Sequence, residues 1–570
     1  MLKNLPTTPE QLLAWTWPDI EPYYQELLSR PLDGASLKEW LADWSGVSEH
    51  VDELMQRLAA ATIVNTADRQ AEERRKSFLE NIYFARALPA EQKLKQKLLD
   101  SGLTPAGFAI PLRNMRAEAQ LFREANLPLL AAEQKLNVEY DKLIAAQSLT
   151  WEGREVTPSE LKLIFQDPDR DHRERAWRAL AQRQLADREA VNELWARYLP
   201  LRLKIAAGAD LPDYRAYMWR HRLRFDYSPD DCKAFHAAIE AVAVPAASRI
   251  YERRRRQLGL DRLRPWDLTD GWYGRPVDAP GQPPLRPYRN GAELRAKVSA
   301  IFYKVDPELG RYFEIMLAEG LADLENRKNK APGAQCLAFA AARRPFIVCN
   351  AVGAHDDVQT TLHESGHAFH VFESAHLPYF PQTAVPLEFA EVASMGMELL
   401  AAPYLTEFYT QAEAARARVE HLEGAILFWP FMAVVDAFQH WVYEHPEAGG
   451  DPAQCDAQWN ALWDRFIPGI DWSGLDEVKA TGWHRKLHIH LYPFYYTEYG
   501  LAQLGAVQIW GNALRDQRQA VAHYRRALAL GGTVTLPELF SAAGARFAFD
   551  AASLQQAVSL MESVIESLGG

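Results

Sequence analysis

The chain has 570 residues, of which 48% are hydrophobic and 24% are charged, and its formal net charge is −12. A chain of this length can bury a large core, and the composition is that of an ordinary globular protein. The acidic balance argues against a nucleic-acid partner and against binding to an anionic membrane surface.

The sequence has few features that would direct the chain to a membrane or out of the cell. Residues 1–11, MLKNLPTTPEQ, lack the apolar stretch of a secretory signal. The longest apolar run, Ala425 to Val435, contains Pro430 and is too short to span a bilayer, so we expect a buried helix there. The four cysteines show no C-x-x-C pairing, which fits free thiols in a reducing compartment. We therefore expect a cytoplasmic monomer or small homo-oligomer with no membrane or nucleic-acid partner.

Helical patterns dominate the first part of the chain. Residues 8–11, TPEQ, form a typical helix start, and long charged helices are expected over residues 66–85 and 113–145. One break occurs at residues 149–156, LTWEGREV, which alternate around a glycine and predict a small hairpin. Further on, Ser228 opens a helical stretch that we expect to end near residue 258.

The middle of the chain combines a Gly/Pro-rich segment with two short strands. Residues 271–290, GWYGRPVDAPGQPPLRPYRN, form either a linker or, as we prefer, a long ordered loop over the unit that holds the next motif. Residues 335–350, QCLAFAAARRPFIVCN, predict two strands joined near the Arg pair. The edge of the first strand, around Phe339 and Ala340, can pair with the backbone of an extended peptide, unless the hairpin is purely structural.

The central motif is the H-E-x-x-H of residues 363–367, His363-Glu364-Ser365-Gly366-His367. On a helix, residues four apart share a face, so both histidines can direct an imidazole nitrogen at one ion. Two neutral imidazoles suit zinc, which in catalytic sites takes a third protein ligand and keeps one position open. Glu364 flanks the same face, where it can act as the general base for a water molecule that attacks a carbonyl.

The surroundings of the motif support a helix that is buried on its far side. Apolar residues lie opposite the two histidines: Val358, Leu362, Phe369 and Phe372. Asp356 or Asp357 can cap the helix start. His370 shares the histidine face but sits too far along the axis to reach the same ion easily, so we expect it to support the site or the structure.

A second helix follows Pro386 with the sequence LEFAEVASMGMELL. Its carboxylates Glu388, Glu391 and Glu398 lie on one face, although carboxylates are poor core residues unless they are paired or bound to a metal. A third zinc ligand after H-E-x-x-H is often a helical carboxylate. Glu388 and Glu391 are both candidates, and their spacing does not separate them.

Residues 484–500, HRKLHIHLYPFYYTEYG, combine histidines with tyrosines at a helix start. The histidines that precede the helix are His488 and His490. The tyrosines are Tyr492, Tyr495, Tyr496 and Tyr499. A phenol or imidazole aimed at the zinc site can stabilise the oxyanion of a tetrahedral intermediate. The alternative interpretation is an aromatic core patch.

Three motifs in register resemble a known family. PFIVCNAVGAHDDVQTTLHESGHAFH, then LEFAEVASMGME, then HIHLYPFYYTEYGLAQLGA, look like the oligoendopeptidase F branch of the thimet oligopeptidase family of zinc peptidases. The resemblance covers roughly residues 200–565, and a helical N-terminal region of the family's kind precedes it. Three motifs in order are far more specific than H-E-x-x-H alone.

The resemblance implies a role for each matched residue. The ligands of one zinc ion would be His363, His367 and Glu391. Glu388 would be a nearby supporting acid, and Glu364 would be the catalytic base. The residues that stabilise the transition state would be His488, Tyr496 and Tyr499, with Tyr495 at the substrate. The loop before the zinc helix, Gly353-Ala354-His355, departs from the Gly-Thr or Gly-His that the family often has there.

Together these interpretations predict a mainly α, two-lobed metallopeptidase with a deep substrate channel and a small β element beside the zinc site. The N-terminal helical lobe would span residues 1–195, and the catalytic lobe would span residues 196–570. The expected activity is zinc-dependent cleavage of internal bonds in short unstructured oligopeptides.

Two other functions stay open at this point. A helical zinc carboxypeptidase can share both the motif and a helical fold, but it needs an arginine near the site for the free carboxylate of its substrate. A non-catalytic peptide-binding scaffold would have no need for Glu364, and the presence of this glutamate argues against it.

Overall fold

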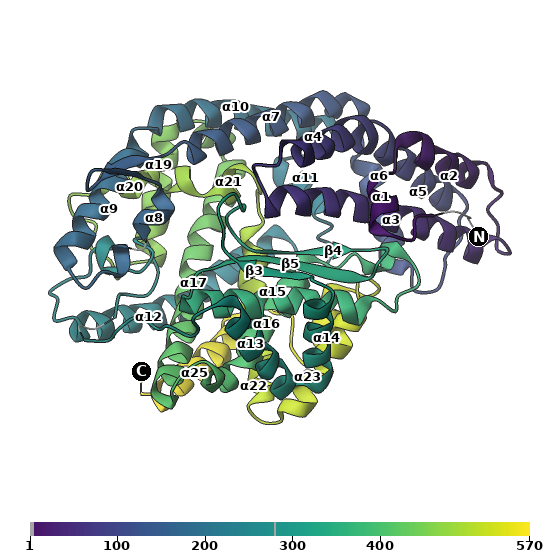
Figure 1. The fold of residues 1–570 in the computed structure, drawn as a ribbon. Helices are drawn as coiled ribbons and strands as arrows, with labels where there is room; N and C mark the ends of the chain where they lie inside the picture. The colour runs from purple at the N-terminus through teal and green to yellow at the C-terminus, as the bar shows by residue number, and fades with distance from the viewer. Residues whose placement is uncertain (1–4, 163, 279–280, 570) are drawn as a thin grey trace. The chain divides into compact units, whose positions relative to one another are not determined.

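The computed structural model describes residues 5–162, 164–278 and 281–569, and within these ranges the chain is mainly helical (Figure 1). The first four residues of the N-terminal segment and two residues of the Gly/Pro-rich segment lie outside the described residues. The mainly α fold with a small β element is confirmed. Contacts within the chain divide it into two compact units. Unit 1 comprises Met1–Ala119, Leu285–Ala414 and Gly505–Phe547, and unit 2 comprises Gln120–Pro284, Ala415–Leu504 and Ala548–Gly570.

These units differ from the lobes 1–195 and 196–570 that we expect from the sequence. Each unit combines three segments that are distant in the chain, and no boundary between the units falls near residue 195. The division by contacts describes each unit by itself. The lobe boundary near residue 195 and the substrate channel stay predictions.

Unit 1 begins with helices around an aromatic core. Their bounds are α1 Pro9–Leu13, α2 Trp17–Ser29, α3 Leu37–Val64, α4 Arg69–Phe78, the π-helix η1 Leu79–Ala87, α5 Leu88–Asp100 and α6 Ala109–Leu121. Thr8 accepts a hydrogen bond from the Gln11 backbone N–H, so the expected helix start is confirmed. The helix expected over residues 66–85 begins later and changes to π geometry after α4. Trp40 and Trp44 are buried in the core, with ring centroids 5.1 Å apart.

The remainder of unit 1 is a three-stranded sheet with helices packed against it. The elements are α13 Gly291–Val305, α14 Pro307–Ala318, β3 Ala322–Glu325, β4 Gln335–Phe339, β5 Arg344–Ala351, α15 His355–Ser374, η5 Phe380–Thr383, α16 Leu387–Ala401, η6 Ala402–Glu407, α23 Gln517–Ala529 and α24 Leu536–Ala542. β5 is central, antiparallel to β4 and parallel to β3. The expected hairpin is confirmed, whereas β3 was not expected. Ala340 lies in the turn after β4, where its carbonyl accepts from the Arg343 N–H.

Helix α15 lies against this sheet, and α16 packs beside α15 (Figure 1). Gly353, with φ of +95°, makes the turn from β5 into α15, a conformation that glycine adopts without strain. The Asp357 carboxylate then accepts hydrogen bonds from the N–H groups of Val352, Gly353 and Ala354 at 2.7–2.8 Å. Of the two expected capping residues, Asp357 therefore holds the start of the helix.

Gly366, inside the H-E-x-x-H motif, lets α15 approach α16 closely. A Cβ atom at this position would lie 2.5 Å from the Ala393 carbonyl oxygen and 2.6 Å from the Ser394 Cα, and both of these are backbone atoms. The apolar side of α15 is buried as expected: Val358, Leu362 and Phe369 are inaccessible, and the half-buried Phe372 stacks on Tyr312.

Unit 2 is helical apart from one small hairpin in the part of it that the structure describes. Its elements are η2 Glu124–Asn126, α7 Leu127–Ala145, β1 Leu149–Trp151, β2 Arg154–Val156, α8 Pro158–Lys162, η3 Ile164–Gln166, α9 Arg170–Leu185, α10 Arg188–Gly208, α11 Tyr214–His221, α12 Pro229–Gln257, η4 Pro265–Asp267, α17 Gln411–Glu444, α18 Pro446–Gly449, α19 Pro452–Phe466, α20 Asp476–Ala480, η7 Thr481–Arg485, α21 Leu487–His490, α22 Tyr496–Ala513 and α25 Ala551–Ser567. The first residues of α17 and the second half of α22 belong to unit 1. The hairpin and the helix after Ser228 are confirmed. The single helix expected over residues 113–145 is wrong, because the chain breaks between α6 and α7.

Helix α17 contains the apolar run that we expect to be buried. Its length and composition would allow it to cross a membrane, but 78% of its apolar window is buried inside the structure. Trp429, Met432 and Val435 are inaccessible. The expectation of a buried core helix is confirmed.

We predict that Gly366→Ala lowers the free energy of unfolding by about 1–3 kcal/mol, because the added methyl group must push apart two packed backbones. Urea denaturation followed by circular dichroism measures the change. The matched control is Gly424→Ala in α17, where an added Cβ meets nothing within 4 Å and the helix surface is exposed. That substitution should stabilise the chain by about 1 kcal/mol through helix propensity. Equal effects of the two substitutions would contradict the close approach at Gly366.

Candidate metal centre

The donor atoms of two histidines of α15 and one glutamate of α16 lie close to one another. His363 Nε2 lies 3.5 Å from Glu391 Oε2, and His367 Nε2 lies 3.8 Å from the same oxygen. One donor atom of each residue lies within 4.8 Å of the other two. Two imidazoles and a carboxylate at these separations are a donor set typical of catalytic metal sites. The residues present therefore fit one metal ion.

The charges in this cluster depend on one another. Burial lowers the pKa of His367 to about 4. Burial acts in the same direction on His363, but Glu391 and Glu398 outweigh it and raise the pKa of His363 well above its ordinary value. Burial alone would raise the pKa of Glu391, yet the two histidines hold it below its usual range. Glu391 is thus kept as the carboxylate, the form in which it can bind a cation.

Glu398 fixes the orientation of His363. Its Oε1 lies 2.6 Å from His363 Nδ1. Since an ionised carboxylate only accepts hydrogen bonds, Nδ1 donates its proton to Glu398. Nε2 is then the nitrogen that would lose its proton and bind a metal ion. The sequence places Glu398 on the same face as Glu391, two turns later, and that spacing is the only signal that could have indicated this role.

Glu388 and His370, the residues expected to support the site, are buried near the cluster without joining it. Neither belongs to the group of three donors found among the described residues. Burial, together with the nearby His367, lowers the pKa of His370 to about 3. The ring of His370 lies edge-on to Phe389, with centroids 6.1 Å apart. The supporting roles of Glu388 and His370 stay predictions.

Glu364 is 6% exposed on the flank of α15. Burial raises its pKa to about 7; His363 opposes the rise, and Glu391 and Glu398 add to it. Its Oε2 makes no hydrogen bond to another residue in the described ranges. A carboxyl group with a pKa near neutrality can both accept and donate a proton at physiological pH.

Strands β4 and β5 border Glu364. Burial raises the pKa of the Cys336 and Cys349 thiols, and the charge of Glu364 adds to the effect on both. β4 is an edge strand of the sheet, as backbone pairing with a peptide requires. The ring of Phe339 is buried, stacks on Phe346 and lies under the guanidinium of Arg57 at 4.1 Å. Its side chain is therefore part of the packing. Substrate binding by Phe339 and Ala340 stays a prediction.

Tyr288, near the end of the Gly/Pro-rich segment, forms hydrogen bonds at the start of α15. Its hydroxyl donates to the Asp357 carboxylate and accepts from the Gly353 N–H at 2.8 Å. The segment is therefore an ordered loop where it reaches unit 1. No pattern around Tyr288 in the sequence indicates this contact, because its partners are more than sixty residues later in the chain.

His488 and the tyrosines belong to unit 2 and form one aromatic cluster. The centroid of the His488 ring lies 4.9 Å from that of Tyr496, 5.8 Å from Tyr495 and 6.2 Å from Tyr499. Burial, with two neighbouring cations, lowers the pKa of His488 to about 3, so the ring is neutral at pH 7. Tyr496 is 4% exposed and its hydroxyl is hydrogen-bonded to that of Tyr273, whereas Tyr499 is half-buried.

His488 and His490 have different surroundings in the structure. The ring of His490 is inaccessible and stacks on Tyr140 at 4.4 Å, with Trp195 and Trp483 also against it. His490 is thus a core residue of unit 2. The imidazole that faces the tyrosines is that of His488.

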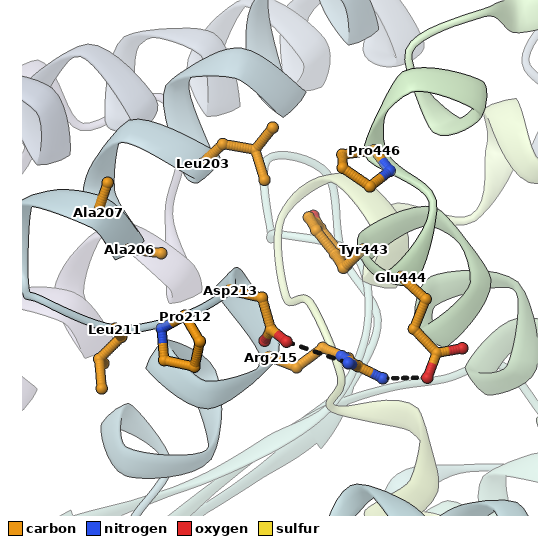
Figure 2. Close-up of a pocket in the computed structure, with 10 residues that line it drawn as sticks. All are labelled: Leu203, Ala206, Ala207, Leu211, Pro212, Asp213, Arg215, Tyr443, Glu444 and Pro446. Carbon is orange, nitrogen blue, oxygen red and sulfur yellow. Dashed lines mark hydrogen bonds and ion pairs between the residues drawn. The ribbon is translucent and has the colours of Figure 1, made fainter.

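A separate cavity of about 410 Å³ lies in unit 2, beside α10, α11 and the end of α17 (Figure 2). Its charged groups are already paired, since Arg215 donates to Asp213 at 3.0 Å and also to Glu444. None of the site residues expected from the sequence lines it. This cavity is therefore distinct from the candidate metal centre and from the aromatic cluster around His488.

Comparison with known proteins gives a family for the chain. The family model of Peptidase family M3 matches residues 163–559. Among curated proteins, Oligopeptidase PepF of Bacillus subtilis (strain 168) is 25% identical over 232 residues. That match covers 40% of this chain and 34% of the relative, so it spans about a third of the relative's length.

Solved structures match nearly the whole chain. A PZ peptidase A with an inhibitor has a TM-score of 0.87 and 26% identity, over 97% of this chain and 98% of its own. A structure named as an oligoendopeptidase F also has a TM-score of 0.87, with 25% identity over 97% of each chain. The resemblance expected from the three motifs is confirmed, and this chain belongs to peptidase family M3.

Proposed function

We propose that this chain is a zinc-dependent endopeptidase that cleaves internal bonds of short, unstructured oligopeptides. The observation that carries the proposal is the convergence of donor atoms from His363, His367 and Glu391 within 4.8 Å, in a chain of a peptidase family. Relatives named as an oligopeptidase and an oligoendopeptidase support short substrates and internal cleavage.

One zinc ion suits the three donors of α15 and α16. Two imidazoles and one carboxylate that leave a fourth position open are a set that catalytic zinc takes in proteins. When bound, zinc supplies a Lewis acid that polarises the scissile carbonyl and lowers the pKa of water. The contact between Glu398 Oε1 and His363 Nδ1 supports this role, because it would keep a proton on Nδ1 when Nε2 binds the ion.

Glu364 is the proposed general base. It accepts the proton that water loses on attack and then donates it to the leaving amine. Its burial and its pKa of about 7 support both steps near neutral pH. A neutral isostere at this position would keep the volume of the side chain and lose the proton acceptor.

His488, Tyr496 and Tyr499 are proposed, on the family motif, as hydrogen-bond donors to the developing oxyanion, with Tyr495 close to the substrate. Their clustering within unit 2 and the neutral His488 ring are compatible with this role. The half-buried position of Tyr499 supports its access to a substrate more than the enclosed position of Tyr496 does.

The remaining proposals rest on composition. The net charge of −12 supports a peptide substrate rather than nucleic acid or an anionic membrane. The described cysteines are free, and three of the four are buried, which supports a reducing, cytoplasmic location. We propose a monomer or a small homo-oligomer.

Glu364→Gln should abolish nearly all turnover while the fold and the bound metal are retained, because it removes the proton acceptor and no ligand. The measurement pairs metal content by mass spectrometry with hydrolysis of a short quenched peptide whose C-terminus is amidated. The amide excludes carboxypeptidase action, so cleavage of this peptide by the wild-type chain identifies an endopeptidase. Substantial residual activity of the variant would refute the role of Glu364.

The proposed preference for short substrates is tested in the same assay. Casein, a long unfolded protein, is offered at matched bond concentration, with and without a metal chelator. We expect slow cleavage of casein, fast cleavage of the peptide, and no cleavage with the chelator. Comparable rates for casein and the peptide would contradict a preference for short substrates.

Substitutions of three carboxylates of α16 should lower the zinc affinity by different amounts. Glu391→Ala should release most of the metal, because it removes a ligand. Glu398→Ala should weaken binding by about 10–100-fold, because His363 loses its orienting acceptor. Glu388→Ala should have the smallest effect. Competition titrations with a zinc-binding dye measure all three, and a larger loss for Glu388→Ala than for Glu391→Ala would show that the third ligand is Glu388.

The tyrosines are tested by removing single hydroxyl groups. Tyr499→Phe and Tyr496→Phe should lower kcat by about a hundredfold and change KM little, if the phenols bond only the transition state. The matched control is Tyr492→Phe, since Tyr492 is 52% exposed and has no proposed role. Unchanged kcat in both variants would show that the cluster is an aromatic core patch without a catalytic role.

A further inference from the structure

A second cluster of potential metal ligands lies in the core of unit 2, where the proposed peptidase chemistry does not use it. Helix α12 contributes Cys232 and His236, and helix α17 contributes Asp436 and His440. In each helix the two residues are four positions apart, so both lie on one face. Donor atoms of Cys232, Asp436 and His440 lie within 4.8 Å of one another.

The carboxylate of Asp436 is the centre of the cluster. His236 Nε2 lies 2.8 Å from Asp436 Oδ2, and His440 Nε2 lies 3.4 Å from the same oxygen. Two imidazoles therefore converge on one carboxylate oxygen, with the thiol of Cys232 within reach. The donor atoms of Cys232, Asp436 and His440 are near enough to one another to share an ion, whereas His236 is hydrogen-bonded to Asp436.

All four side chains are removed from solvent. Cys232 and Asp436 are 0% exposed, and the two histidines are buried as well. The rings of Trp219 and Phe494 lie against His440, with centroids 5.8 Å and 5.2 Å away. In such surroundings every polar atom needs a partner within the site.

Hydrogen bonds between residues of the described ranges do not satisfy this cluster. Asp436 Oδ1 and both ring nitrogens of His440 make none. The partners that do occur are His236 with Asp436, and Thr497 Oγ1, which donates to Cys232 Sγ at 3.9 Å. An unpaired buried polar atom costs about 1–3 kcal/mol, so Asp436 Oδ1 and a ring nitrogen of His440, unpaired in one cluster, indicate a further ligand.

We propose that Cys232, Asp436 and His440 bind a second zinc ion, with a structural role, and that His236 orients Asp436 through its hydrogen bond. One thiolate, one imidazole and one carboxylate are donors of the kind zinc prefers. The two negative ligands balance the charge of a divalent cation, so the occupied site is neutral, as an apolar core requires. Because its ligands come from both helices and are buried, the ion would join α12 to α17 rather than act on a substrate.

A buried water molecule is the other occupant that would satisfy the unpaired atoms. The two occupants differ at the thiol. Beside water, Cys232 Sγ takes part only in hydrogen bonds, such as the one that Thr497 Oγ1 donates. A zinc or cobalt ion deprotonates the thiol that binds it, and the state of Cys232 therefore distinguishes metal from water.

The test uses the full chain expressed in cobalt-supplemented medium. We expect two metal ions per chain and a thiolate-to-cobalt charge-transfer band in the near ultraviolet. The ligands proposed for the peptidase centre include no cysteine, so the band reports the second site alone. Glu391→Ala should lose one ion and keep the band, whether or not the proposed peptidase function is correct.

Cys232→Ser should lose the band, and Cys455→Ser should keep it, because Cys455 is an equally buried thiol of unit 2 outside the cluster. Cys336→Ser, beside the candidate metal centre, should keep it as well. One ion per chain without a band in the wild-type protein would overturn the proposal, as would a band that survives Cys232→Ser. The wild-type measurement decides the matter even if a variant fails to fold.

Discussion

The candidate metal centre depends on how closely helix α15 packs on helix α16. The two histidines of the H-E-x-x-H motif come from one helix and the carboxylate of Glu391 from the other, and Gly366 is the residue that allows the backbones to meet. A larger side chain there would separate the helices and move Glu391 away from His363 and His367. The glycine of the motif thus allows the three candidate donors to come together.

This packing also determines the charges of the site. Burial disfavours every ionised group, yet Glu391 stays ionised because the two histidines are close to it, and His363 is oriented because Glu398 binds its other nitrogen. Glu364 has no such partner among the described residues, and its pKa rises to about 7. Neighbouring carboxylates on two adjoining helices therefore differ in charge because of their surroundings, which suits the proposed roles of Glu391 as a ligand and Glu364 as a base.

Local patterns predicted much of this arrangement. Helix starts at Thr8 and Ser228, the hairpin before α15 and the buried side of α15 all follow from short-range rules, and the structure agrees with each of them. What local patterns could not supply were contacts between distant segments. The choice between Glu388 and Glu391 depends on how α16 is rotated against α15, and the role of Tyr288 depends on a loop that returns to the start of α15. The i, i+4 pairs Cys232/His236 of α12 and Asp436/His440 of α17 are likewise unrelated in the sequence, and only the fold brings them together.

The most direct test of the central claim is anomalous X-ray diffraction at the zinc absorption edge from crystals of the full chain. A metal-bound peptidase predicts a peak that lies within bonding distance of His363 Nε2, His367 Nε2 and a carboxylate oxygen of Glu391, with Glu398 still bonded to His363 Nδ1. A peak bonded to Glu388 instead, or no peak at these histidines in zinc-loaded crystals, would contradict the assignment of the catalytic metal centre.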